Sequence, residues 1–162
     1  MPKFKIIEVK DEIRNKVKGF LETYWGSSKM VTRGNLHHVN KLPGWVVFVE
    51  NEIKGLISYN IINHDCEIVI IYSQIKNTGI GTKFIDLVIK RAKHEKCKRV
   101  WLISTNDNTP AIKFFQKRGF EWVNFYRNAI ESSRKLKPGI PLFGKDKISI
   151  KHELEFEMIL TA

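Results

Sequence analysis

Apolar residues at the start of the chain alternate first and then take a helical spacing. Residues 4–9 alternate between polar and apolar side chains, which is typical of a half-buried strand. With Asp11 as an N-cap, the pattern that follows predicts an amphipathic helix over residues 12–25. Its apolar face consists of Ile13, Val17, Phe20, Leu21 and Tyr24. Residues 28–40 have no clear period and fit either a short second helix or an ordered loop.

Three β-type segments follow. Residues 45–50, 53–62 and 66–73 are rich in apolar and β-branched side chains, and short polar turns separate them. This spacing predicts a meander of antiparallel hairpins. Residues 68–71 are continuously apolar, so the third strand is expected to be central and covered on both faces.

The period then changes to an alternation of helices and strands. A helix is predicted to start just after Gly81, and further helices are predicted over residues 109–118 and 129–137. Strands are predicted over residues 100–104, 120–127 and 153–160. The combination predicts a single α/β domain over residues 1–162, with a mixed, mostly antiparallel central sheet and helices on both faces.

The composition limits where the protein can be located and which ligands it can hold. No apolar run approaches the ~20 residues that span a bilayer, and the first residues lack the apolar stretch of a signal peptide, so we expect a cytoplasmic protein with no membrane partner. Cys66 and Cys97 are not spaced as a disulfide framework or a zinc site, so we expect no metal.

The formal charge of +11 has three interpretations. It fits nucleic-acid binding, an acidic or phosphorylated ligand, or a solvated basic surface. The basic residues are scattered, with no block of five or six and no known nucleic-acid-binding motif, which argues against nucleic acid and favours the solvated surface.

A glycine-containing segment carries the clearest chemical signal. Residues 76–82, Lys-Asn-Thr-Gly-Ile-Gly-Thr, lie between the predicted central strand and the next helix. Glycines let the backbone approach a ligand closely, and the free N–H groups of a helix N-terminus attract an anion such as a pyrophosphate. The segment lacks the Gly-Lys-Ser/Thr of a Walker A loop and the third glycine of a dinucleotide fingerprint.

A second segment, residues 108–120, reads Asn-Thr-Pro-Ala-Ile-Lys-Phe-Phe-Gln-Lys-Arg-Gly-Phe. Alone it predicts a capped helix with Pro110 in its first turn and Gly119 at its end. The two segments together resemble, in order and spacing, the signature of the GNAT superfamily of N-acetyltransferases. That signature is a Gln/Arg-x-x-Gly-x-Gly/Ala loop followed by an Asn-x-x-Ala-x-x-Phe-Tyr-x-x-x-Gly-Phe helix. The resemblance is specific over residues 45–126, and the tail is similar to that of a bacterial subgroup with no assigned substrate.

The resemblance implies acetyl-CoA as cosubstrate. The amides of residues 78–82 would hold the pyrophosphate, the main chain of residues 70–72 would pair with the pantetheine arm, and Asn108 would reach that arm from the other side of a splayed strand pair. Lys76 would frame the loop and Lys117 would approach a phosphate. The predicted cofactor contacts are Ile70, Ile71, Tyr72, Lys76, Asn77, Thr78, Gly79, Ile80, Gly81, Thr82, Asn108, Ala111, Phe114, Phe115 and Lys117.

Acyl transfer to an amine requires a base, because the ammonium form has no lone pair. Glu67 opens the strand that resembles the family's cofactor strand and is the predicted base, with a surface ion pair to a lysine as the alternative. Weaker candidates for the base are His64, Asp107, His152 and Glu153. A backbone N–H near Ile71 would polarise the thioester carbonyl.

One position departs from the family pattern. Phe115 stands where the family often has a tyrosine that protonates the leaving thiolate, and phenylalanine has no proton to donate. Tyr72 or Tyr126 would take that role, or water would protonate the thiolate, or catalysis would be slow or lost. The alternative for both tyrosines is packing within the sheet.

By this resemblance the chain is an acyltransferase that moves an acetyl group from acetyl-CoA to a primary amine by direct attack in a ternary complex. The acceptor is a small metabolite, an antibiotic or a protein amine. Two rival functions stay open: a CoA-binding module that has lost catalysis, and a basic nucleic-acid-binding domain. Superfamily members often dimerise, so a homodimer also stays open.

Overall fold

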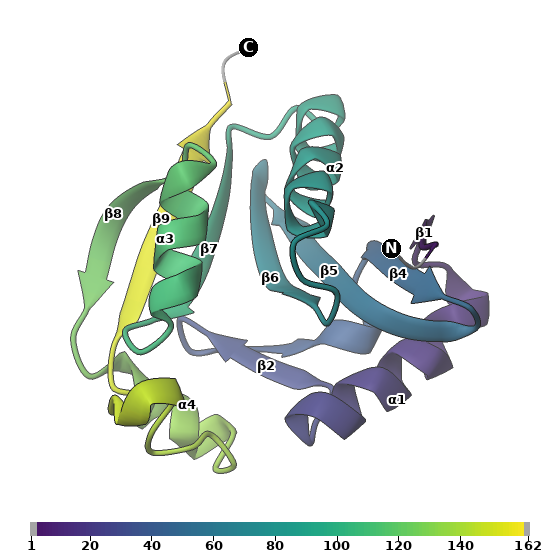
Figure 1. Cartoon of the computed structure of the whole chain (residues 1–162). Helices are drawn as coiled ribbons and strands as arrows, with labels where there is room; N and C mark the ends of the chain where they lie inside the picture. Colours follow the sequence, from purple (N-terminus) through teal and green to yellow (C-terminus); the bar gives the residue numbers. More distant parts are fainter. Residues whose placement is uncertain (1–2, 161–162) are drawn as a thin grey trace.

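A seven-stranded mixed sheet forms the centre of the protein, which a computed structural model describes over residues 3–160 (Figure 1). The strand order across the sheet is β1-β4-β5-β6-β7-β9-β8. These strands are β1 (Lys5–Glu8), β4 (Gly44–Val49), β5 (Glu52–Ile62), β6 (Asp65–Ser73), β7 (Arg99–Thr105), β8 (Glu121–Tyr126) and β9 (Glu153–Ile159). Within residues 3–160, β6 and β7 are the only parallel neighbours in this sheet.

Helices cover both faces of the sheet, which confirms the predicted fold class. One core joins the sheet to α2 (Ile80–His94) and α3 (Thr109–Lys117), and the other joins its opposite face to α1 (Arg14–Trp25). The last helix, α4 (Ala129–Leu136), lies against the strand β2 (Lys29–Thr32). The predicted single domain includes residues 1, 2, 161 and 162, which lie outside the described part of the chain.

Local signals explain how α2 and α3 begin and end. In α2, Phe84, Val88 and Ala92 recur every fourth residue and are fully buried. In α3, Asn108 caps the first turn, where its Oδ1 accepts a hydrogen bond from the Ala111 N–H at 3.3 Å. Gly119 follows with a φ of 92°, a left-handed conformation that ends the helix.

Two predictions near the N-terminus were wrong. Residues 28–40 form neither a second helix nor a loop but mainly a hairpin of β2 and β3 (Asn35–His38), whose turn has positive φ at Arg33 and Gly34. A short 3-10 helix follows it at Val39–Lys41. Asp11 does not cap the first helix, because it lies inside a 3-10 turn (Asp11–Ile13) and accepts a hydrogen bond from Arg14 Nε at 3.0 Å.

The centre of the sheet is irregular where β6 meets β7. Their parallel pairing covers only Asp65–Ile68 against Arg99–Leu102, although β6 runs on to Ser73 and β7 to Thr105. On the other side of β6, Ser58 pairs with Ile70 and Tyr59 pairs with Ile68, so Val69 is the extra residue of a β-bulge. Beyond the bulge the two strands part, and the sheet opens at its middle (Figure 1).

Among residues 3–160, no helix is both long and apolar enough to cross a bilayer.

Candidate active site

The glycine-containing loop lies at the end of β6 that has parted from β7. It connects Ser73, the last residue of β6, to Ile80, the first residue of α2. Gly79 caps that helix with a φ of 76°, and a Cβ built there would meet no atom within 4 Å. The space beside Gly79 at the N-terminus of α2 is therefore open, and the free N–H groups of a helix N-terminus suit a pyrophosphate.

Gly81 has a different role from Gly79. A Cβ at Gly81 would come within 3.0 Å of the Cζ atom of Phe114, so this glycine lets the first turn of α2 approach α3. Phe114 is half-buried against that turn. The two sequence segments that suggested a cofactor site are thus in direct contact, and Phe114 helps to hold the loop in place.

Arg118 is a residue of this site that sequence reasoning missed. Its Nε donates a hydrogen bond to the Thr82 hydroxyl at 3.0 Å, and its guanidinium lies 4.2 Å from the centroid of the Phe114 ring. A fixed positive charge therefore lies beside the first turn of α2, where an anion is favoured. The sequence could have indicated Arg118, because it lies four residues after Phe114 and therefore on the same side of the helix. The predicted Lys117 is exposed.

Two residues of α3 are committed to structural contacts. The Oδ1 atom of Asn108 is used as the helix cap, which leaves its amide NH2 to donate elsewhere. Phe115 is 4% exposed and packs against the rings of Phe120 and Phe156. The position at which the family often has a tyrosine is therefore part of the core in this chain.

The predicted base, Glu67, faces away from α2 and is covered by the β2–β3 hairpin. Its strand neighbours Cys66 and Ile68 belong to the α2 core, so the alternation of β6 turns Glu67 to the opposite face. There the Thr32 hydroxyl donates to Glu67 Oε2 at 2.7 Å, and the His37 ring lies with Nε2 3.6 Å from Oε1. All three side chains are buried.

Further polar and charged side chains from β7, β8 and β9 surround Glu67 on this face. Glu153 is 1% exposed and accepts hydrogen bonds from the backbone N–H and the guanidinium of Arg33. Glu155 accepts from Arg99 at 3.0 Å and from the Tyr126 hydroxyl at 2.8 Å. We call Glu67, Glu153 and Glu155 the carboxylate cluster.

The surroundings of Glu67 place its titration near neutrality. The pKa of Glu67 is raised to about 7, mainly by burial; the hydrogen bond from Thr32 and the charge of Arg99 lower it, and the charges of Glu153 and Glu155 raise it. Burial lowers the pKa of His37 and favours its neutral form. A carboxylate with a pKa near the working pH is suited to general base catalysis.

The two predicted catalytic tyrosines occupy different environments. Tyr126 donates to Glu155, and the guanidinium of Arg33 lies 3.4 Å from the centroid of its ring. Tyr72 lies on β6 beyond the bulge, where its ring packs edge-on against Trp25 at 4.7 Å. The structure therefore groups Tyr126 with the carboxylate cluster and Tyr72 with the aromatic residues of α1.

The weaker candidates for the base have other contacts, apart from Glu153 in the carboxylate cluster. His64 is exposed in the turn before β6. Asp107 accepts a hydrogen bond from the Thr105 hydroxyl. The Nδ1 atom of His152 accepts one from the backbone N–H of Asn128 at 2.9 Å. Within residues 3–160, no group of three or more His, Cys, Asp or Glu side chains is arranged to hold a metal ion.

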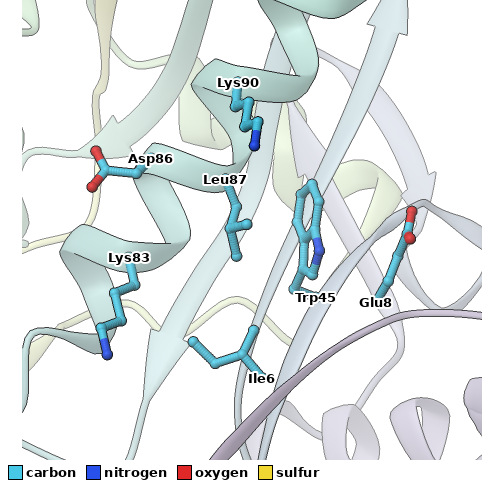
Figure 2. A pocket seen from close by; sticks show the side chains of 7 residues that line it. All are labelled: Ile6, Glu8, Trp45, Lys83, Asp86, Leu87 and Lys90. Atoms are coloured by element: carbon cyan, nitrogen blue, oxygen red, sulfur yellow. The ribbon is translucent and has the colours of Figure 1, made fainter.

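A separate groove of about 460 Å³ lies on the other side of the sheet, between β1, β4 and α2 (Figure 2). Its apolar floor contains Trp45, Ile6 and Leu87, and Figure 2 shows Lys83, Asp86 and Lys90 along its helical side. Because Trp45 belongs to the α2 core, this groove is on the face opposite Glu67. It does not join the carboxylate cluster.

Comparison with known proteins gives a consistent picture. Residues 10–120 match the family described as "Acetyltransferase (GNAT) family". The uncharacterized protein YdhI of Bacillus subtilis is 37% identical over 156 residues, covering 96% of this chain and 98% of that protein.

Solved structures with low identity share the fold. An IAA acetyltransferase from Bacillus cereus superposes with a TM-score of 0.75 at 16% identity, covering 98% of this chain and 100% of that one. A GNAT family acetyltransferase from Elizabethkingia anophelis with acetyl-CoA bound has a TM-score of 0.67 at 19% identity, covering 97% of this chain and 98% of that one.

Proposed function

The chain belongs to the GNAT family of acetyltransferases, and we propose that it acts as a single domain that transfers the acetyl group of acetyl-CoA to a primary amine by direct attack. One observation carries the proposal: β6 parts from β7 after Ile68, and the open N-terminus of α2 lies at that parting. The two features together offer a slot for an extended arm and a seat for its pyrophosphate. The structure of the Elizabethkingia anophelis relative with acetyl-CoA bound supports this cosubstrate.

The residues of this chain would hold the cofactor in two places. The amides of Thr78 to Thr82 would hold the pyrophosphate, with Arg118 adding a positive charge. The backbone of Ile70, Ile71 and Tyr72 lies beyond the parallel pairing and would hydrogen-bond the pantetheine arm. Bound acetyl-CoA supplies an acetyl group activated as a thioester.

Glu67 is proposed as the general base. The ammonium of the acceptor would give up one proton to Glu67 and gain the lone pair that attacks the acetyl carbon. The amide would form as the C–S bond breaks, and the second proton released from the nitrogen balances the proton taken up by the departing thiolate. A carboxylate with a pKa of about 7 is ionised in a large fraction of molecules at neutral pH, yet is basic enough to take up the proton. A neighbouring backbone N–H of β6 would stabilise the developing negative charge on oxygen.

The charge of the carboxylate cluster favours a cationic acceptor. The whole chain carries a formal charge of +11, yet the groups around Glu67 include the buried carboxylates of Glu153 and Glu155. Arg33 and Arg99 offset part of this negative charge through their hydrogen bonds. An ammonium-bearing acceptor suits this site better than an anionic one.

Protonation of the leaving thiolate differs from the family pattern. Phe115 has no hydroxyl group, and the hydroxyl of Tyr126 already donates a hydrogen bond to Glu155. We therefore propose that Tyr126 belongs to the acceptor side of the site. Tyr72, on the strand that would hold the pantetheine arm, is the nearer candidate for the acid, with water as the alternative.

Ligand-dependent thermal unfolding tests the cofactor site. A ligand at a hundred times its dissociation constant adds about 2.7 kcal/mol of stability, so acetyl-CoA should raise the melting temperature clearly, whereas ATP should not. Gly79→Val should abolish that shift. Gly26→Val is the matched control, because Gly26 has a similar φ of 70° and equally open surroundings at the end of α1. No shift with acetyl-CoA in the wild type would overturn the proposal and redirect it to salt-dependent nucleic-acid binding.

A further inference from the structure

Glu67, Thr32 and His37 form a continuous chain of hydrogen-bonding atoms. The Thr32 Oγ1 atom lies 2.7 Å from Glu67 Oε2 and 2.7 Å from His37 Nε2. The three residues come from β6, β2 and β3, and they are 6%, 7% and 7% exposed. A hydroxyl that donates one bond and accepts another can pass a proton between its two neighbours without any movement of heavy atoms.

The outer end of this chain reaches solvent. Within residues 3–160, the Nδ1 atom of His37 makes no hydrogen bond. In that part of the chain, Ser58 Oγ is the one side-chain nitrogen or oxygen atom that is both fully buried and without a hydrogen-bond partner, so Nδ1 is not fully buried. Nδ1 therefore keeps some contact with solvent in a side chain that is 7% exposed, while Nε2 faces Thr32.

We propose that Thr32 and His37 form a proton relay that carries the proton collected by Glu67 to solvent. This role rests on the proposed function of Glu67 as the base. Neither residue reaches the reacting atoms in this scheme, so both act as positioning residues.

Each proton in the relay can be followed from one atom to the next. When Glu67 is protonated, it donates to Thr32 Oγ1, and the Thr32 hydroxyl donates to Nε2 of a neutral His37 that carries its proton on Nδ1. The Glu67 proton then moves to Thr32 as the Thr32 proton moves to Nε2, which leaves a carboxylate and an imidazolium. Loss of the Nδ1 proton to water leaves neutral His37 with its proton on Nε2. The ring must return to the Nδ1 tautomer by proton exchange with solvent before it can accept the next proton.

Other charged groups face the relay without interrupting it. Glu153 and Glu155 approach Glu67 from β9, and Arg99 approaches it from β7. Arg33 on the hairpin is bound to Glu153, and Tyr126 on β8 is bound to Glu155. On β5, the residue opposite Glu67 is the uncharged Asn60. His37 is thus the neutral group joined to Glu67 through a hydroxyl, and it can accept the proton.

The tautomer of His37 provides a test that needs no activity. Nitrogen-15 NMR of the imidazole ring distinguishes protonated from unprotonated nitrogen, and His37→Gln assigns its signals among the five histidines. In the wild type we expect the proton on Nε2 when Glu67 is ionised, near pH 8.5, and on Nδ1 when Glu67 is protonated, near pH 6. In Thr32→Val the tautomer should no longer follow Glu67. A tautomer that stays fixed in the wild type would overturn the relay.

Kinetics separate the relay from the proposed function. Thr32→Ser keeps the hydroxyl and should retain activity, whereas Thr32→Val and His37→Gln should lower kcat by about tenfold or more with the KM for acetyl-CoA unchanged. His37→Gln keeps a hydrogen-bonding side chain and removes only the titration. Tautomer switching without acetyl transfer to any amine would refute the function and leave the relay standing. Acetyl transfer that is unchanged in both variants would refute the relay alone.

Discussion

The guanidinium of Arg118 donates a hydrogen bond from Nε to the hydroxyl of Thr82 at 3.0 Å. This contact joins the C-terminal end of α3 to the first turn of α2. It leaves the other N–H groups of the guanidinium beside the helix N-terminus, where they can bind phosphate oxygens. Arg118 therefore couples the two segments that mark the cofactor site.

We predict that Arg118→Met weakens acetyl-CoA binding by about tenfold, equivalent to about 1.4 kcal/mol, because a charge-assisted contact to phosphate is lost. Isothermal titration calorimetry measures the change in Kd. The adjacent Lys117→Met serves as the control, since Lys117 is exposed and carries the same charge. Equal losses in the two variants would contradict a special role of Arg118, because they would mean that Lys117 contributes as much to binding.

A second prediction concerns stability and pH. The pKa of Glu67 is raised from 4.5 to about 7 by folding, so the cost of ionising it in the folded protein is absent below pH 4.5, grows as pH rises towards 7, and is fully present above that pH. Glu67→Gln removes this penalty. The unfolding free energy of Glu67→Gln, measured relative to that of the wild type, should therefore rise by about 2.5 kcal/mol between pH 5 and pH 9.

Urea unfolding at the two pH values measures this difference, since contributions of the other titrating groups cancel. The exposed control Glu12→Gln should stay within about 0.5 kcal/mol of wild type throughout. If the relative stability of Glu67→Gln does not change with pH, Glu67 does not titrate near neutrality.

A third prediction assigns Tyr126 to the acceptor side. Tyr126→Phe removes one donor from Glu155 and should cost about 1 kcal/mol of stability, while kcat stays within about twofold of wild type. Urea unfolding and a thiol-release assay provide the two values. A loss of activity of about 100-fold, with disappearance of the alkaline limb of the pH profile, would instead identify Tyr126 as the leaving-group acid.

A fourth prediction compares two arginines. Arg99 binds Asp65, Glu155 and Glu157 on the Glu67 side, whereas Arg91 binds Glu8 and Tyr59. Arg99→Met leaves several carboxylates uncompensated and should destabilise the protein by about 2–3 kcal/mol at neutral pH.

Arg91→Met should lower the free energy of unfolding by about 1 kcal/mol, because Arg91 has a single carboxylate partner and that partner is half-exposed. Urea unfolding measures both losses. The difference in unfolding free energy between the two variants should become smaller at acidic pH, where the carboxylates around Arg99 become protonated. A loss from Arg91→Met that equals or exceeds the loss from Arg99→Met would contradict this account.

The parts of the site that depend on local signals were predictable from the sequence. Gly79 marks the loop because a left-handed residue must precede α2, and Asn108 with Gly119 marks both ends of α3. Glu67 was also singled out as the candidate base, by its place at the start of the strand that resembles the family's cofactor strand, and that role stays a proposal. Most of the strand and helix boundaries came out within a few residues for the same reason.

The partners of Glu67 could not be identified in this way. Thr32 and His37 lie 35 and 30 positions before it in the chain, on a hairpin whose short strands left no clear period. The available signal was Arg33-Gly34, because a two-residue turn with positive φ at both positions joins hairpin strands. The parting of β6 from β7 is a tertiary feature that no hydrophobic pattern records.

The most direct test of the account is the pH dependence of CoA thiol release from acetyl-CoA with a panel of cationic and neutral primary amines. We predict that thiol release depends on the amine and that its kcat/KM rises with pH, with a midpoint near the Glu67 pKa of about 7. In Glu67→Gln this rise with pH should be lost. The cationic amines should be the better acceptors. No amine-dependent release, or the same pH profile in both proteins, would contradict the account.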